Sequence, residues 1–342
     1  MNHIQKTLFI LTFSLLVACA PTMHMPQISD EMAQGEALKQ QKLALGKFLS
    51  QQERLQRIAH PILTKNIQFC ENDIGPVFGF GAATQNDFGR EWQQAAAEGF
   101  GLAEQPTVFY VGAGSAASGK LQKGDVLLAV DGKAIGKQGT NPIKNNKNSE
   151  ITLTIDRHGK QKDVTLRGQK ACDHPSFVEL NETVNAYADG NRIVFTTGMM
   201  NFANDTELAT VYGHELAHNV MGHIDSKMGN AALGALLGAV IAVGTGVDVT
   251  QEMSNIGAGA YSQSFEGEAD YVGLYLTARG GYSIANASHF WRKMAEAHPA
   301  SIHLEGGSHP STAKRFLALE HTVKEINKKK AAGQPLVPNK AQ

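Results

Sequence analysis

The sequence lacks an excess of charge of either sign. Its 342 residues include 31 lysines and arginines against 32 aspartates and glutamates. No basic field exists to hold a phosphate backbone, so nucleic acid is excluded as an expected partner. Hydrophobic residues make up 42% of the chain, which is enough for the cores of two ordinary domains and argues against general disorder.

Cysteine is scarce, with only three in the chain. Cys70 and Cys172 lack the second cysteine or spaced histidine of a zinc ribbon, so neither is expected to bind metal. The third, Cys19, follows an apolar run near the N-terminus. In an exported chain Cys70 and Cys172 are expected to pair, because disulfides persist outside the cytosol. Two buried free thiols are the alternative.

The N-terminal residues 1–18 predict an export signal. Lys6 precedes an apolar run over residues 8–18, which is too short to span a bilayer comfortably. Residues 16–19, Leu-Val-Ala-Cys, resemble a bacterial lipobox, which implies a lipid on Cys19 and membrane attachment through it. Ala20 in place of aspartate resembles the outer-membrane pattern of Gram-negative lipoproteins, so the periplasmic face of that membrane is expected. An ordinary cleaved signal is the alternative.

The remaining chain divides into four expected parts. Residues 19–72 are predicted to be an N-terminal helical part of the catalytic domain, with a helix over residues 29–60 that Pro61 ends. Residues 73–170 carry glycines and short β-type runs. Residues 171–328 carry the chemistry, and residues 329–342, which are rich in lysine and then contain proline, are expected to form a loose tail.

Residues 73–170 resemble a bacterial PDZ domain. The resemblance rests on residues 121–132, where a leucine precedes a Gly-Asp turn, a strand and an Asp-Gly pair, and on expected strands at 107–111, 151–155 and 164–166. It implies that an extended peptide adds to an open sheet edge, which would recruit or gate substrate. Residues 78–81 are the candidate carboxylate-binding loop, or merely a glycine-rich turn. A Cys70–Cys172 bond would hold the root of this insertion.

The run His-Glu-Leu-Ala-His at residues 214–218 carries the clearest chemical signal. Asn204 and Glu207, three residues apart, predict that a helix begins just before it. On that helix His214 and His218 project from the same face toward one cation, while Glu215 is offset enough to reach a water bound to it. Glu215 is therefore the expected general base for attack on a carbonyl. A chance match in an unrelated helix is the alternative.

A catalytic zinc site needs a third protein ligand and an open fourth position. The run at residues 262–270, Ser-Gln-Ser-Phe-Glu-Gly-Glu-Ala-Asp, offers three carboxylates. Glu266 and Asp270 are four residues apart and share a helix face, whereas Glu268 points elsewhere. Glu266 is the expected ligand, and Asp270 is expected to orient a ligating imidazole through its other nitrogen. Glu268 remains the alternative ligand, or a solvated or inter-helix charge.

These two runs together resemble the zinc metallopeptidases of family M48, which includes the CAAX prenyl proteases and HtpX-like enzymes. Gln263 stands where the family usually has arginine, which puts that arginine's ion pair in doubt but not the chemistry. A later run, Ser-His-Pro at 308–310 followed by Arg315, resembles the family's C-terminal motif. It implies that His309 occupies the metal's open position at rest or stabilises the oxyanion, and that Arg315 lies behind the ligands. A turn residue is the alternative for His309, and His223 is expected to be structural.

The expected fold is therefore α+β, a zincin-like (gluzincin) metallopeptidase domain with an inserted β-rich, PDZ-like domain. One Zn²⁺ per chain is expected, with an extended protein or peptide substrate along an edge strand at residues 191–196. The resemblance implies envelope proteins as substrates and a role in protein quality control. The uncharged residues 229–247 are expected to form a lid or a membrane-facing hairpin rather than a span.

Rival functions are a chaperone or binding module with a silent site and a non-peptide metallohydrolase. Glu215 argues against the first, because a structural zinc site needs no general base. Prenyl-protein processing is disfavoured, since relatives with that role carry several long apolar spans and this chain does not. The oligomeric state stays open.

Overall fold

The computed structural model describes residues 26–71, 73–136, 147–226, 262–297 and 313–340. Predictions about the export signal, Cys19, residues 229–247 and His309 fall outside these ranges. The chain divides into two compact units, residues 1–40 and 41–342, and every site discussed below lies in the second. No helix among the described residues is long and apolar enough to cross a membrane.

The N-terminal helix α2 (Asp30–Lys65) continues through Pro61, so the prediction that this proline ends it is wrong. Proline has no N–H to donate to the carbonyl of Arg57, and the Tyr282 hydroxyl donates to that carbonyl instead, at 3.5 Å. Ile62 is fully buried one residue later, and its packing holds the last turn in place. The side-chain amide of Asn66 then donates to the carbonyls of Ile62 and Leu276, where the helix ends.

The β-rich part between residues 74 and 172 has its own core. Its six-stranded antiparallel sheet has the order β2-β3-β4-β6-β7, with β5 paired to β4. The strands are β2 (Phe80–Ala83), β3 (Thr107–Val111), β4 (Val126–Val130), β5 (Lys133–Ala134), β6 (Glu150–Arg157) and β7 (Lys160–Arg167). Helix α3 (Gln93–Phe100) and the short helices η2 (Gln85–Asp87) and η3 (Arg90–Trp92) belong to this part, and η1 (Ile67–Phe69) precedes it. The strands predicted at 107–111, 151–155 and 164–166 and within 121–132 are confirmed as β3, β6, β7 and β4.

The chain enters and leaves this β-rich part through a two-stranded sheet. Strand β1 (Ile74–Val77) pairs antiparallel with β8 (Gln169–Cys172), with Ile74 opposite Cys172. A disulfide joins Cys70 to Cys172, with the two Cα atoms 5.6 Å apart, and both cysteines are buried. The two ends of the insertion are thus joined both by backbone pairing and covalently.

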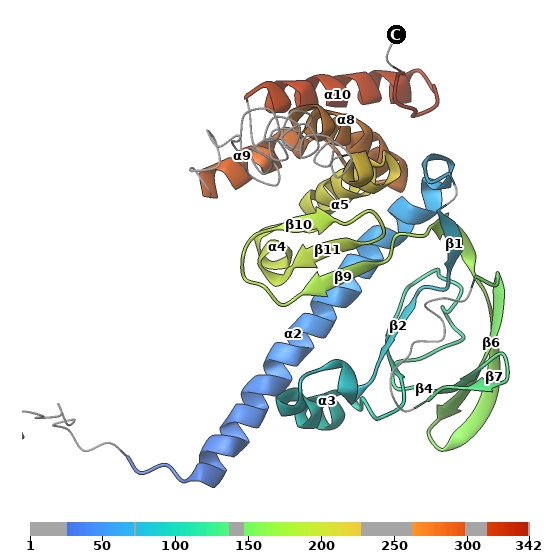
Figure 1. The fold of residues 1–342 in the computed structure, drawn as a ribbon, viewed down its shortest axis with the longest axis vertical. Coiled ribbons are helices and arrows are strands. Elements are labelled where there is room, and N and C mark those ends of the chain that lie inside the picture. The colour runs from blue at the N-terminus through green and yellow to red at the C-terminus, as the bar shows by residue number, and fades with distance from the viewer. Residues whose placement is uncertain (1–25, 72, 137–146, 227–261, 298–312, 341–342) are drawn as a thin grey trace, which may run out of the picture. The chain divides into compact units, whose positions relative to one another are not determined.

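A three-stranded sheet and the helices that follow it carry the candidate site (Figure 1). The sheet order is β10-β11-β9, with β9 (Ser176–Glu179), β10 (Ala186–Ala188) and β11 (Ile193–Thr196). After the short α4 (Thr197–Phe202) come α5 (Asp205–Val220), α8 (Ser262–Gly280), α9 (Ala287–Ala297) and α10 (Ala313–Ala331). Helix α5 packs on α8 and on β10, and α10 packs on α8 and α9.

Two sequence-based expectations are corrected here. Residues 191–196 were expected at a sheet edge, but β11 lies between β10 and β9. The tail after residue 328 was expected to be loose, but α10 runs to Ala331 and residues 334–340 fold back. Lys329 donates to the carbonyl of Val337 at 2.7 Å, and the backbone N–H of Asn339 donates to the Tyr271 hydroxyl at 2.9 Å. Both errors have one cause, because long-range partners leave no local pattern in the sequence.

Candidate metal centre

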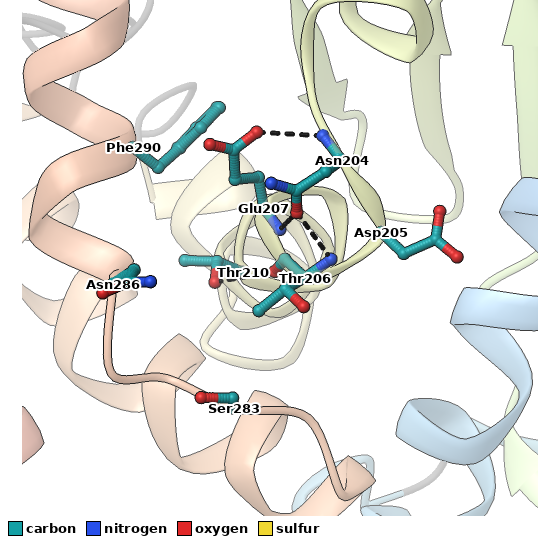
Figure 2. A pocket seen from close by; sticks show the side chains of 8 residues that line it. All are labelled: Asn204, Asp205, Thr206, Glu207, Thr210, Ser283, Asn286 and Phe290. Atoms are coloured by element: carbon teal, nitrogen blue, oxygen red, sulfur yellow. Dashed lines mark hydrogen bonds between the residues drawn. The ribbon is translucent and has the colours of Figure 1, made fainter.

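Helix α5 begins where the capping pattern predicts. The Asn204 side chain accepts hydrogen bonds from the backbone N–H groups of Thr206 and Glu207, both at 3.0 Å, and Glu207 accepts from the N–H of Asn204 at 2.9 Å (Figure 2). All residues from 208 to 219 are buried, so packing fixes the rotation of the helix. The pocket drawn in Figure 2 lies at this capped end, ten residues before His214, and carries none of the predicted ligands.

Three side chains converge further along α5 and on the facing α8. The Nε2 atoms of His214 and His218 lie 3.2 Å apart. Oxygens of Glu266 lie 3.4 Å from the first Nε2 and 3.3 Å from the second. Tetrahedral zinc with bonds of 2.0–2.2 Å holds its ligand atoms about 3.3 Å apart, so the three groups fit this ion. All three residues are buried.

The electrostatics of the cluster favour a cation. Burial by itself lowers the pKa of His214, but the carboxylates of Asp270 and Glu266 outweigh it and raise the pKa to about 10. Burial also lowers the pKa of His218, and there the contact with Glu266 does not reverse the effect. The carboxylates thus stabilise positive charge beside one imidazole while the other stays neutral, which suits a divalent metal held by two lone pairs and a carboxylate.

A close contact between two glycines brings the helices together at this level. A Cβ atom on Gly273 of α8 would lie 2.8 Å from the backbone N and Cα of His214. A Cβ atom on Gly213 of α5 would lie 2.2 Å from the Thr277 hydroxyl oxygen and 2.5 Å from the carbonyl oxygen of Gly273. The backbones therefore touch, which lets the short Glu266 side chain reach both histidines. The sequence analysis missed this pair, although two glycines inside buried helices were the available signal.

His214 is held from behind by a buried ion pair. Its Nδ1 lies 3.1 Å from Oδ1 of Asp270. Arg315 of α10 donates two hydrogen bonds to that carboxylate, from Nε at 2.7 Å and from Nη2 at 2.9 Å. Its Nη1 lies 3.2 Å from a carboxylate oxygen of Glu266. Burial raises the pKa of Asp270, but Arg315 lowers that pKa by more than burial raises it, so the carboxylate stays ionised. The Trp291 ring lies against the guanidinium, with its centroid 5.0 Å from Cζ of Arg315. The structure thus places Asp270 and Arg315 behind His214, as the sequence suggested.

His218 is held from behind by a second imidazole. Its Nδ1 lies 3.0 Å from Nδ1 of His223, whose Nε2 lies 3.1 Å from a carboxylate oxygen of Glu268. The ring of Phe265 stacks on His223 with centroids 4.6 Å apart. His223 was expected from the sequence to be structural, and its contact with His218 was not predicted, because α5 ends at Val220 and the helical repeat does not place residue 223. Gly222, with a φ of 64°, turns the chain back there.

Residues 161–323 match the family model described as Peptidase family M48. This match includes helices α5 and α8, so the part of the chain that carries the three converging side chains is similar to the M48 peptidases. The chain is similar to the mitochondrial metalloendopeptidase OMA1 of Arabidopsis thaliana, with 33% identity over 135 residues, which is 39% of this chain and 28% of that protein.

Two bacterial metalloproteases are also similar to this chain. LoiP of Escherichia coli is 29% identical over 147 residues, or 40% of this chain and 58% of LoiP. YcaL of the same organism is 28% identical over 207 residues, covering 56% of this chain and 80% of YcaL. The matches to OMA1 and LoiP thus span less than two thirds of those relatives.

The remaining predicted site residues divide into those that the structure describes and those that it does not. Glu215 is buried on α5 between the two histidines, and it is not among the three groups that converge. His309 lies outside the described residues, as does Cys19. Among the described residues, His214, His218 and Glu266 form the group that could hold a metal ion.

Proposed function

We propose that this protein is a zinc-dependent metalloendopeptidase with one Zn²⁺ per chain. The observation that carries the proposal is the buried triangle of His214, His218 and Glu266, with the Glu215 carboxylate on the same helix turn. Three protein ligands with an adjacent base are typical of catalytic zinc, whereas structural sites close with four ligands and need no base. The match of residues 161–323 to the family model of peptidase family M48 supports the same conclusion.

The residues then have separate tasks. Zinc, when bound, supplies a Lewis acid and lowers the pKa of a bound water to about 7. Glu215 accepts a proton from the attacking water and delivers it to the leaving amine nitrogen. Asp270 and Arg315 hold His214 in the orientation that directs its Nε2 to the metal. His309 remains a proposed group for the open position or the oxyanion.

The substrate is proposed to lie extended along β10. This strand pairs with β11 on one side, and no described strand pairs with its other side. Its counterpart β9 is covered by α2, because Gln52 donates to the carbonyl of Ser176 and accepts from the N–H of Val178, while Gln56 also donates to Ser176. Strand β10 packs on α5, which carries the histidines, so a peptide added at this edge would pass the metal centre.

We also propose a role for the β-rich part, a location for the protein and a class of substrate, each on its own observation. The six-stranded sheet and its own core support a PDZ-like role for residues 73–170 in recruiting or gating substrate. The lipobox-like residues 16–19 support a lipid anchor at Cys19 and a place on the periplasmic face of the outer membrane. Envelope proteins as substrates, and a role in quality control, follow from that location.

The test uses the chain from residue 19 onward with Cys19 replaced, and compares zinc content with casein cleavage. Glu215→Gln is expected to keep about one zinc and lose cleavage by about 10³-fold or more, because the base is gone and the ligands are not. Glu266→Gln is expected to lose zinc. Glu182→Gln, at an exposed position, is the matched control and should change neither. Equal zinc and equal inactivity in the native chain and Glu215→Gln would leave an autoinhibited enzyme or the chaperone function, and a gain of cleavage in His309→Ala would favour autoinhibition.

A further inference from the structure

The two predicted imidazole ligands are supported from behind in different ways. Nδ1 of His214 faces a carboxylate, that of Asp270, at 3.1 Å. Nδ1 of His218 faces another imidazole nitrogen, Nδ1 of His223, at 3.0 Å. A metal-bound imidazole donates from its second nitrogen to an acceptor, and that acceptor sets both its tautomer and its orientation. The acceptor for His218 is therefore a ring that itself has two tautomers.

Two facing ring nitrogens can share only one hydrogen. When Nε2 of His218 offers its lone pair to a metal, its Nδ1 carries the hydrogen, so Nδ1 of His223 has to accept. A neutral His223 that accepts at Nδ1 carries its own hydrogen on Nε2. That Nε2 lies 3.1 Å from the carboxylate of Glu268, which accepts hydrogen bonds only, so the ionised carboxylate selects this tautomer.

The surroundings of His223 hold its ring in one position between His218 and Glu268. The ring is buried at 3% exposure and stacks on Phe265 at an interplanar angle of 16°. Gly222 turns the chain in the left-handed region, where a side chain is disfavoured, and this turn brings His223 back beneath α5. Glu268 lies on α8 two residues after Glu266, so the helix that supplies the third ligand also supplies the end of this chain of contacts.

We propose that Glu268 and His223 are positioning residues that fix the tautomer and ring orientation of His218 and thereby set the affinity of the centre for zinc. The inference rests on the proposed function, since it assumes that His218 is a metal ligand. Neither residue is among the three described groups that could hold the metal ion. The order of the effects is defined, because the Glu268 carboxylate selects the tautomer of His223, and His223 in turn selects the tautomer of His218.

The main rival is that His223 only fills space between α5 and α8. His223→Phe separates the two ideas, because it keeps an aromatic ring against Phe265 and removes both nitrogens. His223→Gln restores a carbonyl acceptor toward His218 and an amide donor toward Glu268. Glu268→Ala removes the outer acceptor, whereas Glu268→Gln keeps an acceptor oxygen without the charge. His289→Phe, at an exposed position on α9, is the matched control.

The first measurement is the zinc dissociation constant from competition with a chelator, together with thermal unfolding of each zinc-free protein. We expect His223→Phe and Glu268→Ala to weaken zinc binding by about 10- to 100-fold, with the Gln variants closer to the native chain. The unfolding midpoint of the zinc-free protein should change little between His223→Phe and His223→Gln. Equal zinc affinity of His223→Phe and the native chain, or a loss that His223→Gln does not reduce, would overturn the proposal.

The second measurement reads the tautomers directly from long-range ¹H–¹⁵N spectra of the histidine rings in the zinc-loaded chain. We expect the hydrogen of His218 on Nδ1 and that of His223 on Nε2, with His223 losing this preference in Glu268→Ala. The opposite tautomer of His223 in the native chain would overturn the proposal even if a variant fails to fold. Glu266→Gln distinguishes the two levels, because unchanged zinc binding there refutes the metal centre itself, whereas zinc loss there with native affinity in His223→Phe refutes only the positioning role.

Discussion

Two buried carboxylates among the described residues are each paired with an arginine. In the β-rich part Asp125 is almost wholly buried, and Arg157 donates to it through Nε at 2.6 Å while the backbone N–H of Gln122 donates at 2.9 Å. In the metal centre Asp270 has the same relation to Arg315. Such pairs contribute little when compared with a well-packed apolar core, but removing one partner leaves the other charge buried and is costly.

Asp125 gives a prediction for pH dependence. Burial raises its pKa, but the contacts with Arg157 and Gln122 outweigh this and lower it below the ordinary value of 3.8. A carboxyl whose pKa is lower in the folded chain contributes stability above its unfolded value and loses it as the pH falls through the folded value. We expect Asp125→Asn to lower the free energy of unfolding of the β-rich part by about 3 kcal/mol at pH 7.

The same difference should shrink as the pH falls below about 3.8, because Asp125 of the unfolded chain then takes up a proton that the folded carboxyl, with its lower pKa, takes up only at lower pH. Urea unfolding of both proteins at pH 7, 5 and 3.5 measures it. Asp163→Asn, at an exposed position on β7, serves as the control. A difference that stays constant down to pH 3.5 would contradict the assigned ion pair.

Among the elements, the α5–α8 pair decides whether the site exists. Ligands from two helices can meet only if the helix axes approach closely, and here Gly213 and Gly273 allow backbone contact beside His214. The Thr277 hydroxyl adds a hydrogen bond across the gap, donating to the carbonyl of Ala209 at 3.1 Å. The distance between the two helices is therefore set by Gly213 and Gly273, which have no side chains, as much as by apolar packing.

Gly273→Ala tests this packing. The added methyl group would lie 2.8 Å from the backbone of His214, which cannot move aside as a flexible side chain would. We expect the helices to separate by enough to weaken zinc binding at least tenfold and to destabilise the fold by about 1–3 kcal/mol. Zinc titration and thermal unfolding measure the two effects.

Gly267→Ala is the matched control on the same helix, because a Cβ atom there meets nothing within 4 Å. It should be neutral or stabilise the helix by about 0.5–1 kcal/mol, since alanine favours helix more than glycine does. Equal effects of the two substitutions would show that helix propensity, and not the contact with α5, governs position 273.

At the scale of the whole molecule, the chain enters the β-rich part after α2 and leaves it through β8 about a hundred residues later. The Cys70–Cys172 disulfide closes this excursion over a sequence separation of 102 residues. It lies at the paired strands β1 and β8, and both of its cysteines pack with the core that also holds α5 and α8. The bond thus connects the base of the insertion to the part that carries the metal centre.

Removing the disulfide should destabilise the protein strongly. A closed loop of this length is worth about 3–5 kcal/mol through the entropy of the unfolded chain. We expect the Cys70→Ala, Cys172→Ala double variant to unfold at lower urea and to be cut faster by added protease, with zinc stoichiometry unchanged. Reducing the native chain should reproduce the effect and leave the double variant unaffected. A double variant as stable as the native chain would contradict this role.

Local features of the sequence by themselves determined several helices and strands and most of the candidate metal site. The His214–His218 spacing needs only the helical repeat to bring two imidazoles to one face, and the Asn204 cap states where that helix begins. The spacing of Glu266 and Asp270 separated them from Glu268 by the same rule. Strands β3, β6 and β7 followed from short apolar runs between turn residues. All of these depend on interactions within a few residues along the chain.

Only the tertiary structure decided the features that depend on distant partners. Strand β11 is central because β9 pairs with it, and α2 continues past Pro61 because Tyr282 and the core supply what the proline lacks. His223 reaches His218 only because Gly222 reverses the chain and α8 brings Glu268 to meet it. A local pattern specifies the element and the face, whereas packing between remote segments selects the neighbour that each face meets.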